Sequence, residues 1–166
     1  NLSIVYNEVG EFDKGMEVYQ RAKEAELGDM GTQKAKMIDS YLDPNVKGKV
    51  ANMHADIGHI YKDLNMLDNA IVEYEKALVL SPGFVDIKTM LGAVYREKRN
   101  FTEALKHLEE AVALNPDFTP SRVQLGLTYY VMGQIENSRN EWLKVLKKSP
   151  DDKLARMYMN LIEKNK

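Results

Sequence analysis

The chain has 166 residues, with 23 Lys and Arg against 25 Asp and Glu, a formal net charge of -2, and no Cys. The lack of Cys excludes a disulfide framework, a Cys-based zinc site and a thiol nucleophile. The balanced charge lacks the basic excess of nucleic-acid-binding proteins, and no apolar run reaches the roughly 18 residues that cross a membrane. We therefore expect a folded protein that binds no nucleic acid and inserts into no membrane. Its location stays open, with a soluble cytoplasmic protein slightly favoured.

Several residue types recur at intervals of 34 residues. The recurring columns are Gly58, Gly92 and Gly126; Tyr61, Tyr95 and Tyr129; and Pro82, Pro116 and Pro150. Self-similarity at a fixed period is the signature of a repeat architecture. In the first copy, Gly58 and Tyr61 share one face of a predicted helix, and Ala70 and Tyr74 share one face of a second. The period predicts three complete helix pairs, at 51–84, 85–118 and 119–152.

The segment before the first complete copy carries the same pattern, displaced. Leu2 and Tyr6 stand where Ile57 and Tyr61 stand, so residues 1–29 resemble a repeat that lacks its first five residues. Because a repeat cut within a helix leaves apolar surface bare, we expect the natural protein to continue upstream.

A 21-residue insert is predicted at about 30–50, between the partial repeat and the first complete copy. Met37, Ile38, Tyr41 and Leu42 form one apolar helical stripe there. We interpret the insert as a short extra helix or an elongated second helix. Its stripe is interpreted as packing rather than as a partner site.

Each complete copy contains signals for where its second helix begins and ends. An apolar residue precedes a polar one at the expected start, as in Leu67-Asp68 and Phe101-Thr102. We predict that Asp68 and Thr102 are N-caps. The prolines close the second helices, because proline cannot continue a helix. Residues 153–166 form a last amphipathic helix, which we expect to cap the array.

These residues resemble the tetratricopeptide repeat family. The first copy reads His54-x-x-Ile57-Gly58-x-x-Tyr61, followed by Ala70-x-x-x-Tyr74, Ala77 and Pro82. His54, and its equivalents Lys88 and Arg122, depart from the Trp that this family often has. The resemblance implies an all-α fold: a right-handed superhelical solenoid of antiparallel helix pairs with a C-terminal capping helix.

Residues that would carry out catalysis are not apparent. The sequence has no Gly-rich phosphate loop, no Gly-x-Ser-x-Gly and no nucleophile pair. Asp56, His59 and Asp63 have the spacing of a helical metal site, but a polar helix face is usually just solvated. We predict a protein that is not an enzyme, with no cofactor and no metal.

The resemblance implies a binding groove on the concave side, lined by the first helix of each pair. The predicted lining is Asn52, Ala55, His59, Lys62, Asp63, Asp86, Thr89, Ala93, Arg96, Glu97, Pro120, Val123, Leu127, Tyr130 and Val131, with Met157, Tyr158 and Leu161 from the cap. This lining is polar at 52–97 and apolar at 120–161. One alternative stays open, which is that the cap simply covers Val123, Leu127 and Tyr130.

The chaperone co-factors of this family grip a C-terminal acidic tail with Lys and Asn at two groove positions, and with further Lys or Arg in later repeats. Those positions hold Ala55 and His59, Thr89 and Ala93, and Val123 and Leu127 here. The clamp is absent, so we do not expect binding to such tails.

The leading hypothesis is a non-catalytic protein-interaction scaffold that binds a peptide or partner helix in the groove. Under this hypothesis the chain can also associate with a second copy of itself through an exposed end of the array. One alternative is a regulatory or substrate-recruiting segment of a larger multidomain enzyme. RNA binding is disfavoured, because Lys62 and Arg96 face more acidic than basic neighbours on the predicted lining.

Overall fold

The computed structural model describes residues 16–17 and 44–164. The chain divides into two units, residues 1–52 and 53–166, and each is considered by itself. The predicted partial repeat and most of the predicted insert lie outside the described residues. Within 44–164 the secondary structure is entirely helical, with short turns between the helices.

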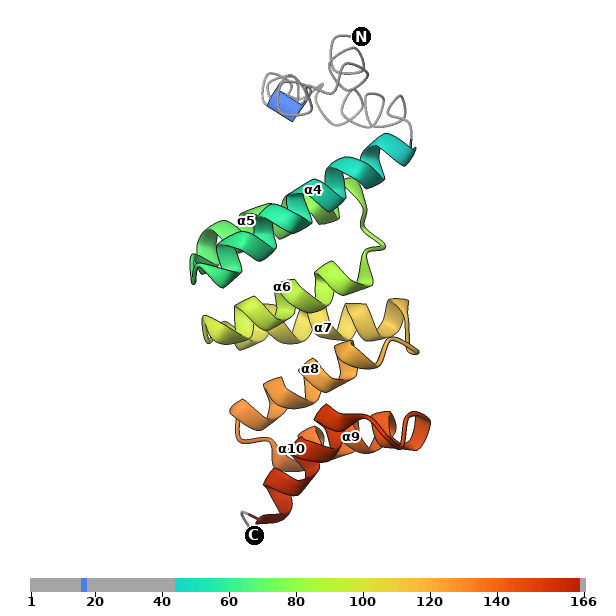
Figure 1. Cartoon of the computed structure of the whole chain (residues 1–166). Helices are drawn as coiled ribbons and strands as arrows, with labels where there is room; N and C mark the ends of the chain where they lie inside the picture. Colours follow the sequence, from blue (N-terminus) through green and yellow to red (C-terminus); the bar gives the residue numbers. More distant parts are fainter. Residues whose placement is uncertain (1–15, 18–43, 165–166) are drawn as a thin grey trace. The chain divides into compact units, whose positions relative to one another are not determined.

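Residues 44–164 form seven helices, labelled here as in Figure 1. They are α4 (Pro44–Asp63), α5 (Leu67–Leu80), α6 (Val85–Glu97), α7 (Phe101–Leu114), α8 (Thr119–Val131), α9 (Ile135–Lys148) and α10 (Lys153–Lys164). The helices α4, α6 and α8 are the first helices of the predicted pairs, and α5, α7 and α9 are the second helices.

The first helix of the series is longer than predicted. It begins at Pro44 and runs for 20 residues without a break. Residues 44–50, which we assigned to the insert, are therefore the first turns of α4. A proline in the first turn of a helix is favourable, because the amide hydrogen that it lacks would have no partner there.

Each pair is held together by a glycine on the first helix and a large side chain on the second. A methyl group at Gly58 would lie 2.6 Å from Cε1 of Tyr74, and one at Gly92 would lie 2.6 Å from Cγ of Leu108. At Gly126 it would lie 2.8 Å from Cδ1 of Trp142. These distances are too short for real carbon contacts, so only glycine permits the approach.

The prediction of the N-caps was wrong by two residues. The second helices begin at Leu67, Phe101 and Ile135, so their caps are Met66, Asn100 and Gln134. Of these caps, Asn100 accepts a hydrogen bond from a backbone amide of its helix, that of Glu103. Asp68 lies instead within the first turn, where its negative charge favours the positive end of the helix dipole.

The turn inside each pair uses a left-handed residue, a feature that the sequence did not reveal. Asn65, Arg99 and Gly133 have φ of 58°, 60° and 77°. The next residue then donates its backbone amide five residues back, as from Asn100 to the Tyr95 carbonyl at 2.9 Å. This is the hydrogen bond of a Schellman helix end. Only the third copy has the usual glycine at this position.

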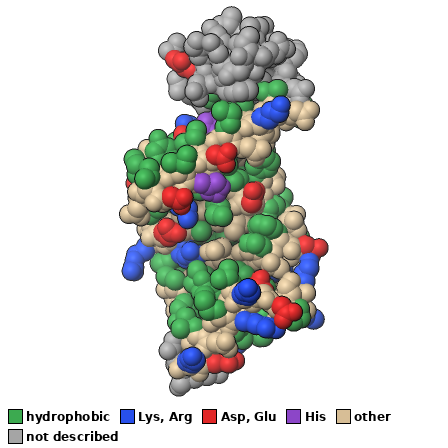
Figure 2. Space-filling view, viewed as in Figure 1, with side chains coloured by type: hydrophobic (Ala, Val, Ile, Leu, Met, Phe, Trp, Pro, Cys, Tyr) green, Lys and Arg blue, Asp and Glu red, His purple; other side chains and the backbone are tan. Residues whose placement is uncertain are grey.

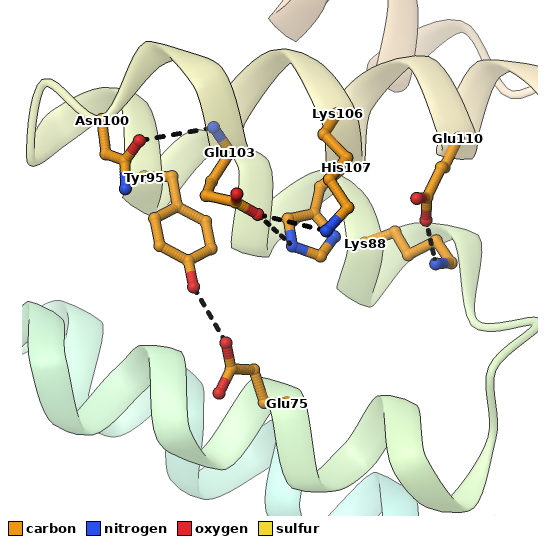
Figure 3. A network of polar contacts seen from close by, with 8 residues as sticks. All are labelled: Glu75, Lys88, Tyr95, Asn100, Glu103, Lys106, His107 and Glu110. Atoms are coloured by element: carbon orange, nitrogen blue, oxygen red, sulfur yellow. Dashed lines mark hydrogen bonds and ion pairs between the residues drawn. The ribbon is translucent and has the colours of Figure 1, made fainter.

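Polar contacts replace the family's frequent Trp on each first helix. His54 Nδ1 lies 2.6 Å from Glu73 Oε2, and Arg122 donates to Glu141 Oε2 at 3.0 Å. In the middle pair, Lys88 instead donates to Glu110 Oε2 at 2.6 Å, as Figure 3 shows. Each first helix is therefore joined to its second helix by a charged contact.

Successive pairs are joined by a recurring tyrosine contact. The Tyr95 hydroxyl donates to Glu75 Oε1 at 2.8 Å, as drawn in Figure 3. One repeat later, the Tyr129 hydroxyl donates to Glu109 Oε1 at 3.1 Å. Burial, followed by the hydrogen bond to Glu75, raises the pKa of Tyr95 to about 12. The tyrosine column thus connects one first helix to the preceding second helix.

The last helix, α10, closes the array. Ala155 and Ile162 are buried in one apolar cluster with Trp142, and the Tyr158 ring stacks on Trp142 with centroids 4.9 Å apart. Asp152 caps the helix, because its Oδ1 accepts a hydrogen bond from the Ala155 amide at 2.9 Å. The described residues thus form an all-α solenoid with a C-terminal capping helix, as predicted.

Candidate functional site

Helices α4, α6, α8 and α10 lie in front of the second helices in Figure 1. We call the side chains that these four helices present to solvent the first-helix face. Figure 2, drawn in the same orientation, shows that this face carries apolar, acidic and basic side chains. The predicted site residues belong to these helices, so each one can be placed by its burial and contacts.

Four of the predicted site residues are buried. Ala55, Thr89, Ala93 and Val123 are at most 5% exposed. The Thr89 hydroxyl donates to the Val85 carbonyl at 2.7 Å and lies 2.8 Å from the Ser121 hydroxyl. Thr89 thus joins α6 to α8, and a partner would meet the exposed neighbours of these four buried side chains instead.

Six predicted residues are half-buried: His59, Lys62, Arg96, Leu127, Tyr130 and Tyr158. His59 Nδ1 lies 2.8 Å from the Tyr74 hydroxyl, and Arg96 donates to Gln124 Oε1 at 2.6 Å. Burial lowers the pKa of Arg96. Both polar side chains are therefore engaged within the array while part of their surface stays open.

The aromatic residues predicted for the apolar end belong partly to the core. Tyr130 packs against Trp142 with ring centroids 6.1 Å apart, and Tyr158 stacks on the same indole. Leu127 packs against this cluster, and Val123 is a buried member of it. Val123 is therefore buried, and Leu127 and Tyr130 are partly buried, in a cluster to which the cap contributes Ala155 and Ile162.

Beside this cluster, an apolar surface remains open to solvent. Val131 is 50% exposed, Leu154 50%, Met157 51% and Leu161 41%. We call these four residues the apolar strip. Leu154, Met157 and Leu161 lie one repeat length after Pro120, Val123 and Leu127, so they occupy the predicted groove positions of a fourth first helix. That register could have identified Leu154, which the predicted lining omitted.

The other half of the first-helix face is acidic. Asp56 and Asp63 on α4, and Asp86 and Glu97 on α6, are all exposed. We call these four residues the acidic half. Figure 2 shows acidic side chains over these two helices, beside a histidine. Burial, followed by the charges of Asp63 and Glu97, raises the pKa of Tyr74 to about 12. Carboxylates from both helices therefore act on one side chain.

Of the other predicted residues, Asn52 and Pro120 are exposed. Among residues 16–17 and 44–164, no group of three or more His, Asp or Glu side chains has the arrangement of a metal site. No helix in the described part is both long and apolar enough to span a membrane.

Sequence models of the tetratricopeptide repeat match residues 51–84 and 86–118. Residues 51–84 and 86–118 are therefore tetratricopeptide repeats. Repeats of this kind stack into solenoids that present extended binding surfaces. A comparison with curated protein sequences gives no significant match.

Solved structures share the fold at low sequence identity. The first TPR domain of Spaghetti (RPAP3), bound to an HSP90 peptide, is 22% identical, with a TM-score of 0.66 over 71% of this chain and 94% of that chain. The Arabidopsis OM64 TPR domain is 13% identical, with a TM-score of 0.67 over 72% and 99%. MamA is 21% identical, with a TM-score of 0.63 over 99% and 84%. These similarities establish the fold and leave the ligand to be argued from this chain.

Proposed function

We propose that the chain is a non-catalytic scaffold that binds a peptide or a helix of a partner protein on its first-helix face. The observation that carries this proposal is the apolar strip. A capping helix normally turns a polar surface to solvent, and α10 does so at Arg156, Asn160 and Glu163, which are exposed. Its exposed leucines and methionine lie on another face, where they would serve as anchors for a partner.

The spacing within the strip supports recognition of a peptide or helix. Leu154, Met157 and Leu161 stand at i, i+3 and i+7, so they lie along one side of α10, and Val131 adds the end of α8. Contiguous exposed apolar side chains rimmed by polar residues mark interaction sites. Helix-in-groove recognition uses the same kind of surface.

The peptide-bound RPAP3 structure supports a peptide as ligand only in general terms. In this chain, four of the six clamp positions are occupied by Ala55, Thr89, Ala93 and Val123, and all four are buried. Ala55, Ala93 and Val123 have no donor group, and the buried Thr89 hydroxyl donates to the Val85 carbonyl. An acidic tail is therefore not the ligand that we propose.

The test compares two triple variants of the chain. The strip variant carries Leu154→Gln, Met157→Gln and Leu161→Gln. The control variant carries Val72→Gln, Val79→Gln and Leu114→Gln, which change side chains of similar exposure on the second helices. Each protein is used for quantitative affinity capture, and circular dichroism verifies that both variants fold.

We expect the strip variant to capture at least about tenfold less of a partner protein that the parent and the control variant both capture. The reason is that central apolar anchors each contribute more than about 1 kcal/mol to binding. Equal capture by both variants would refute the proposal. A second copy of the chain as the captured partner would show self-association, which sedimentation of the purified chain measures independently.

A further inference from the structure

We infer that the partner segment is basic at one end and apolar at the other, with its basic end over α4 and α6 and its apolar end over α8 and α10. This inference rests on the proposed function and specifies the ligand of the same face. It follows from which charges the fold leaves unpaired, and from where the apolar strip begins.

Carboxylates on the two sides of the array differ in their partners. Every carboxylate on α5, α7 and α9 has a hydrogen-bond or ion-pair partner. Examples are Glu73 with Lys76 at 2.7 Å, Glu110 with Lys88 at 2.6 Å and Glu141 with Arg122 at 3.0 Å. The four carboxylates of the acidic half make no hydrogen bond or ion pair with any residue in the described part of the chain. The unpaired negative charge therefore gathers on the first-helix face.

Cations on the same half do not cancel this charge. Lys62 on α4 and Arg96 on α6 are half-buried, whereas the four carboxylates of the acidic half are exposed. Arg96 is also held by Gln124. A ligand with Lys or Arg at this end would meet exposed acceptors, whereas a ligand with Asp or Glu would meet like charges.

The acidic half lies on α4 and α6, and α6 is the neighbour of α8, where the apolar end of the first-helix face begins. Helix α6 is joined to α8 by the Thr89–Ser121 contact at 2.8 Å and the Arg96–Gln124 hydrogen bond at 2.6 Å. Beyond α8, the strip residues on α10 are all apolar. One segment that crosses the first helices in order would thus meet acidic side chains first and apolar side chains last.

The physical chemistry of the two halves assigns them different roles. Apolar anchors supply most of the binding free energy because they are removed from water. Exposed charges mainly increase the association rate and select against partners of the wrong sign, and salt screens them. With first helices about 9 Å apart, an extended segment of roughly ten residues covers the face.

The experiment uses fluorescein-labelled peptides of about ten residues and the whole chain. One peptide carries lysines in one half and leucines in the other, and is made in both orders. A second has glutamates in place of the lysines, and a third has serines in place of the leucines. Affinities are measured by fluorescence anisotropy at about 0.05 M and about 0.5 M salt.

We expect the lysine–leucine peptide, in its better order, to bind at least about tenfold tighter than the glutamate–leucine peptide at low salt, with the gap narrowing at high salt. The serine peptide should bind more weakly than the leucine peptide at both salt concentrations. Equal or tighter binding of the glutamate–leucine peptide would overturn the charge inference and leave the proposed function standing. If the strip variant binds both leucine-containing peptides as tightly as the parent does, the proposed function is wrong.

Two charge variants locate the effect on the face. The first carries Asp56→Asn, Asp63→Asn, Asp86→Asn and Glu97→Gln. The matched control carries Asp68→Asn, Asp117→Asn, Glu136→Gln and Asp151→Asn, which change the net charge equally at exposed sites elsewhere. We expect the first variant alone to lose the preference for lysine over glutamate. If the control loses it equally, overall charge rather than the acidic half selects the ligand.

Discussion

The middle and last helix pairs share one register and differ in what fills it. In α6–α7, Gly92 on the first helix faces Leu108 on the second, whereas in α8–α9 Gly126 faces Trp142. All four residues are buried. The glycine is common to both pairs because the two helices approach closely at that point. The side chain opposite the glycine, Leu108 or Trp142, differs with the element that packs next in the array.

What lies beyond differs between the two pairs. The Trp142 indole donates to the Val123 carbonyl at 3.1 Å and also receives Tyr158 of the cap on its face. The middle pair is followed by another repeat rather than by the cap, so Leu108 has no capping helix to contact. The comparison indicates that one large aromatic residue both fills the last pair and anchors α10, the helix that carries most of the apolar strip.

The largest expected effect comes from removing that aromatic anchor. Trp142→Ala should lower the free energy of unfolding by about 3–5 kcal/mol, since it empties a fully buried site. Leu108→Ala should cost about 2–5 kcal/mol. The two variants should differ at α10, because only Trp142 contacts it. Urea unfolding followed by far-UV circular dichroism measures the cost.

Amide hydrogen exchange at 153–164 distinguishes the two variants. Protection of these amides should fall in Trp142→Ala and stay close to that of the parent in Leu108→Ala when global stability is corrected for. Unchanged protection in Trp142→Ala would show that α10 is held by other contacts.

A smaller effect is expected from adding one methyl group to the glycine that faces Trp142. Gly126→Ala should destabilise the chain by about 1–3 kcal/mol, because the new carbon overlaps a rigid indole ring. Gly48→Ala is the matched control: it also lies within a helix, and nothing lies within 4 Å of its added carbon. There the higher helix propensity of alanine should stabilise by up to about 1 kcal/mol.

Thermal unfolding of both glycine variants provides the measurement. The difference between them isolates the contact with Trp142, because the change in helix propensity is the same in both. A stabilising Gly126→Ala would mean that the indole moves aside freely.

The sequence predicted the fold well because its strongest constraints are steric and periodic. The glycine column, the large residues opposite it and the prolines two residues after each second helix all occupy the predicted places. It failed at helix starts, where the polar residue after Phe101 suggested a cap, although Asn100 is the cap. Local signals of this kind are ambiguous by one or two residues, whereas a 34-residue period is not.

The candidate site was less predictable, because burial depends on neighbours that are remote in sequence. Register alone placed both Thr89 and Leu127 in the lining of a groove. The contact with Ser121 from the next repeat buries Thr89, and the Trp142 cluster partly covers Leu127. The strip residue Leu154 was missing from the predicted lining, although it follows Pro120 by one repeat length as Met157 follows Val123.

The smallest expected effect concerns a polar position at which the two helix pairs carry different residues. Where the last pair has Glu141, the middle pair has His107. Its ring stacks on Tyr95 with centroids 5.6 Å apart, and its Nδ1 is buried with no hydrogen-bond partner among the described residues. Lys88, Lys106, Glu103 and Glu110 surround it, as Figure 3 shows for all four.

Burial lowers the pKa of His107 below its usual value of 6.5. Because the folded state then binds this proton less readily than the unfolded state, the stabilising contribution of neutral His107 is complete above about pH 6.5 and is lost as the pH falls below that value. Below about pH 4.5, protonation of Glu110 adds a second loss, since its hydrogen bond from Lys88 lowers its pKa.

His107→Gln removes the histidine titration and keeps a polar side chain of similar length. Urea unfolding of the parent and the variant, measured from pH 8 to about pH 5, should give parallel free energies above pH 6.5 and a loss in the parent alone below it. His59→Gln serves as the control, because it replaces a half-buried histidine of another helix pair in the same way. Parallel profiles for the parent and His107→Gln throughout would show that His107 accepts its proton as readily in the folded chain as in the unfolded one.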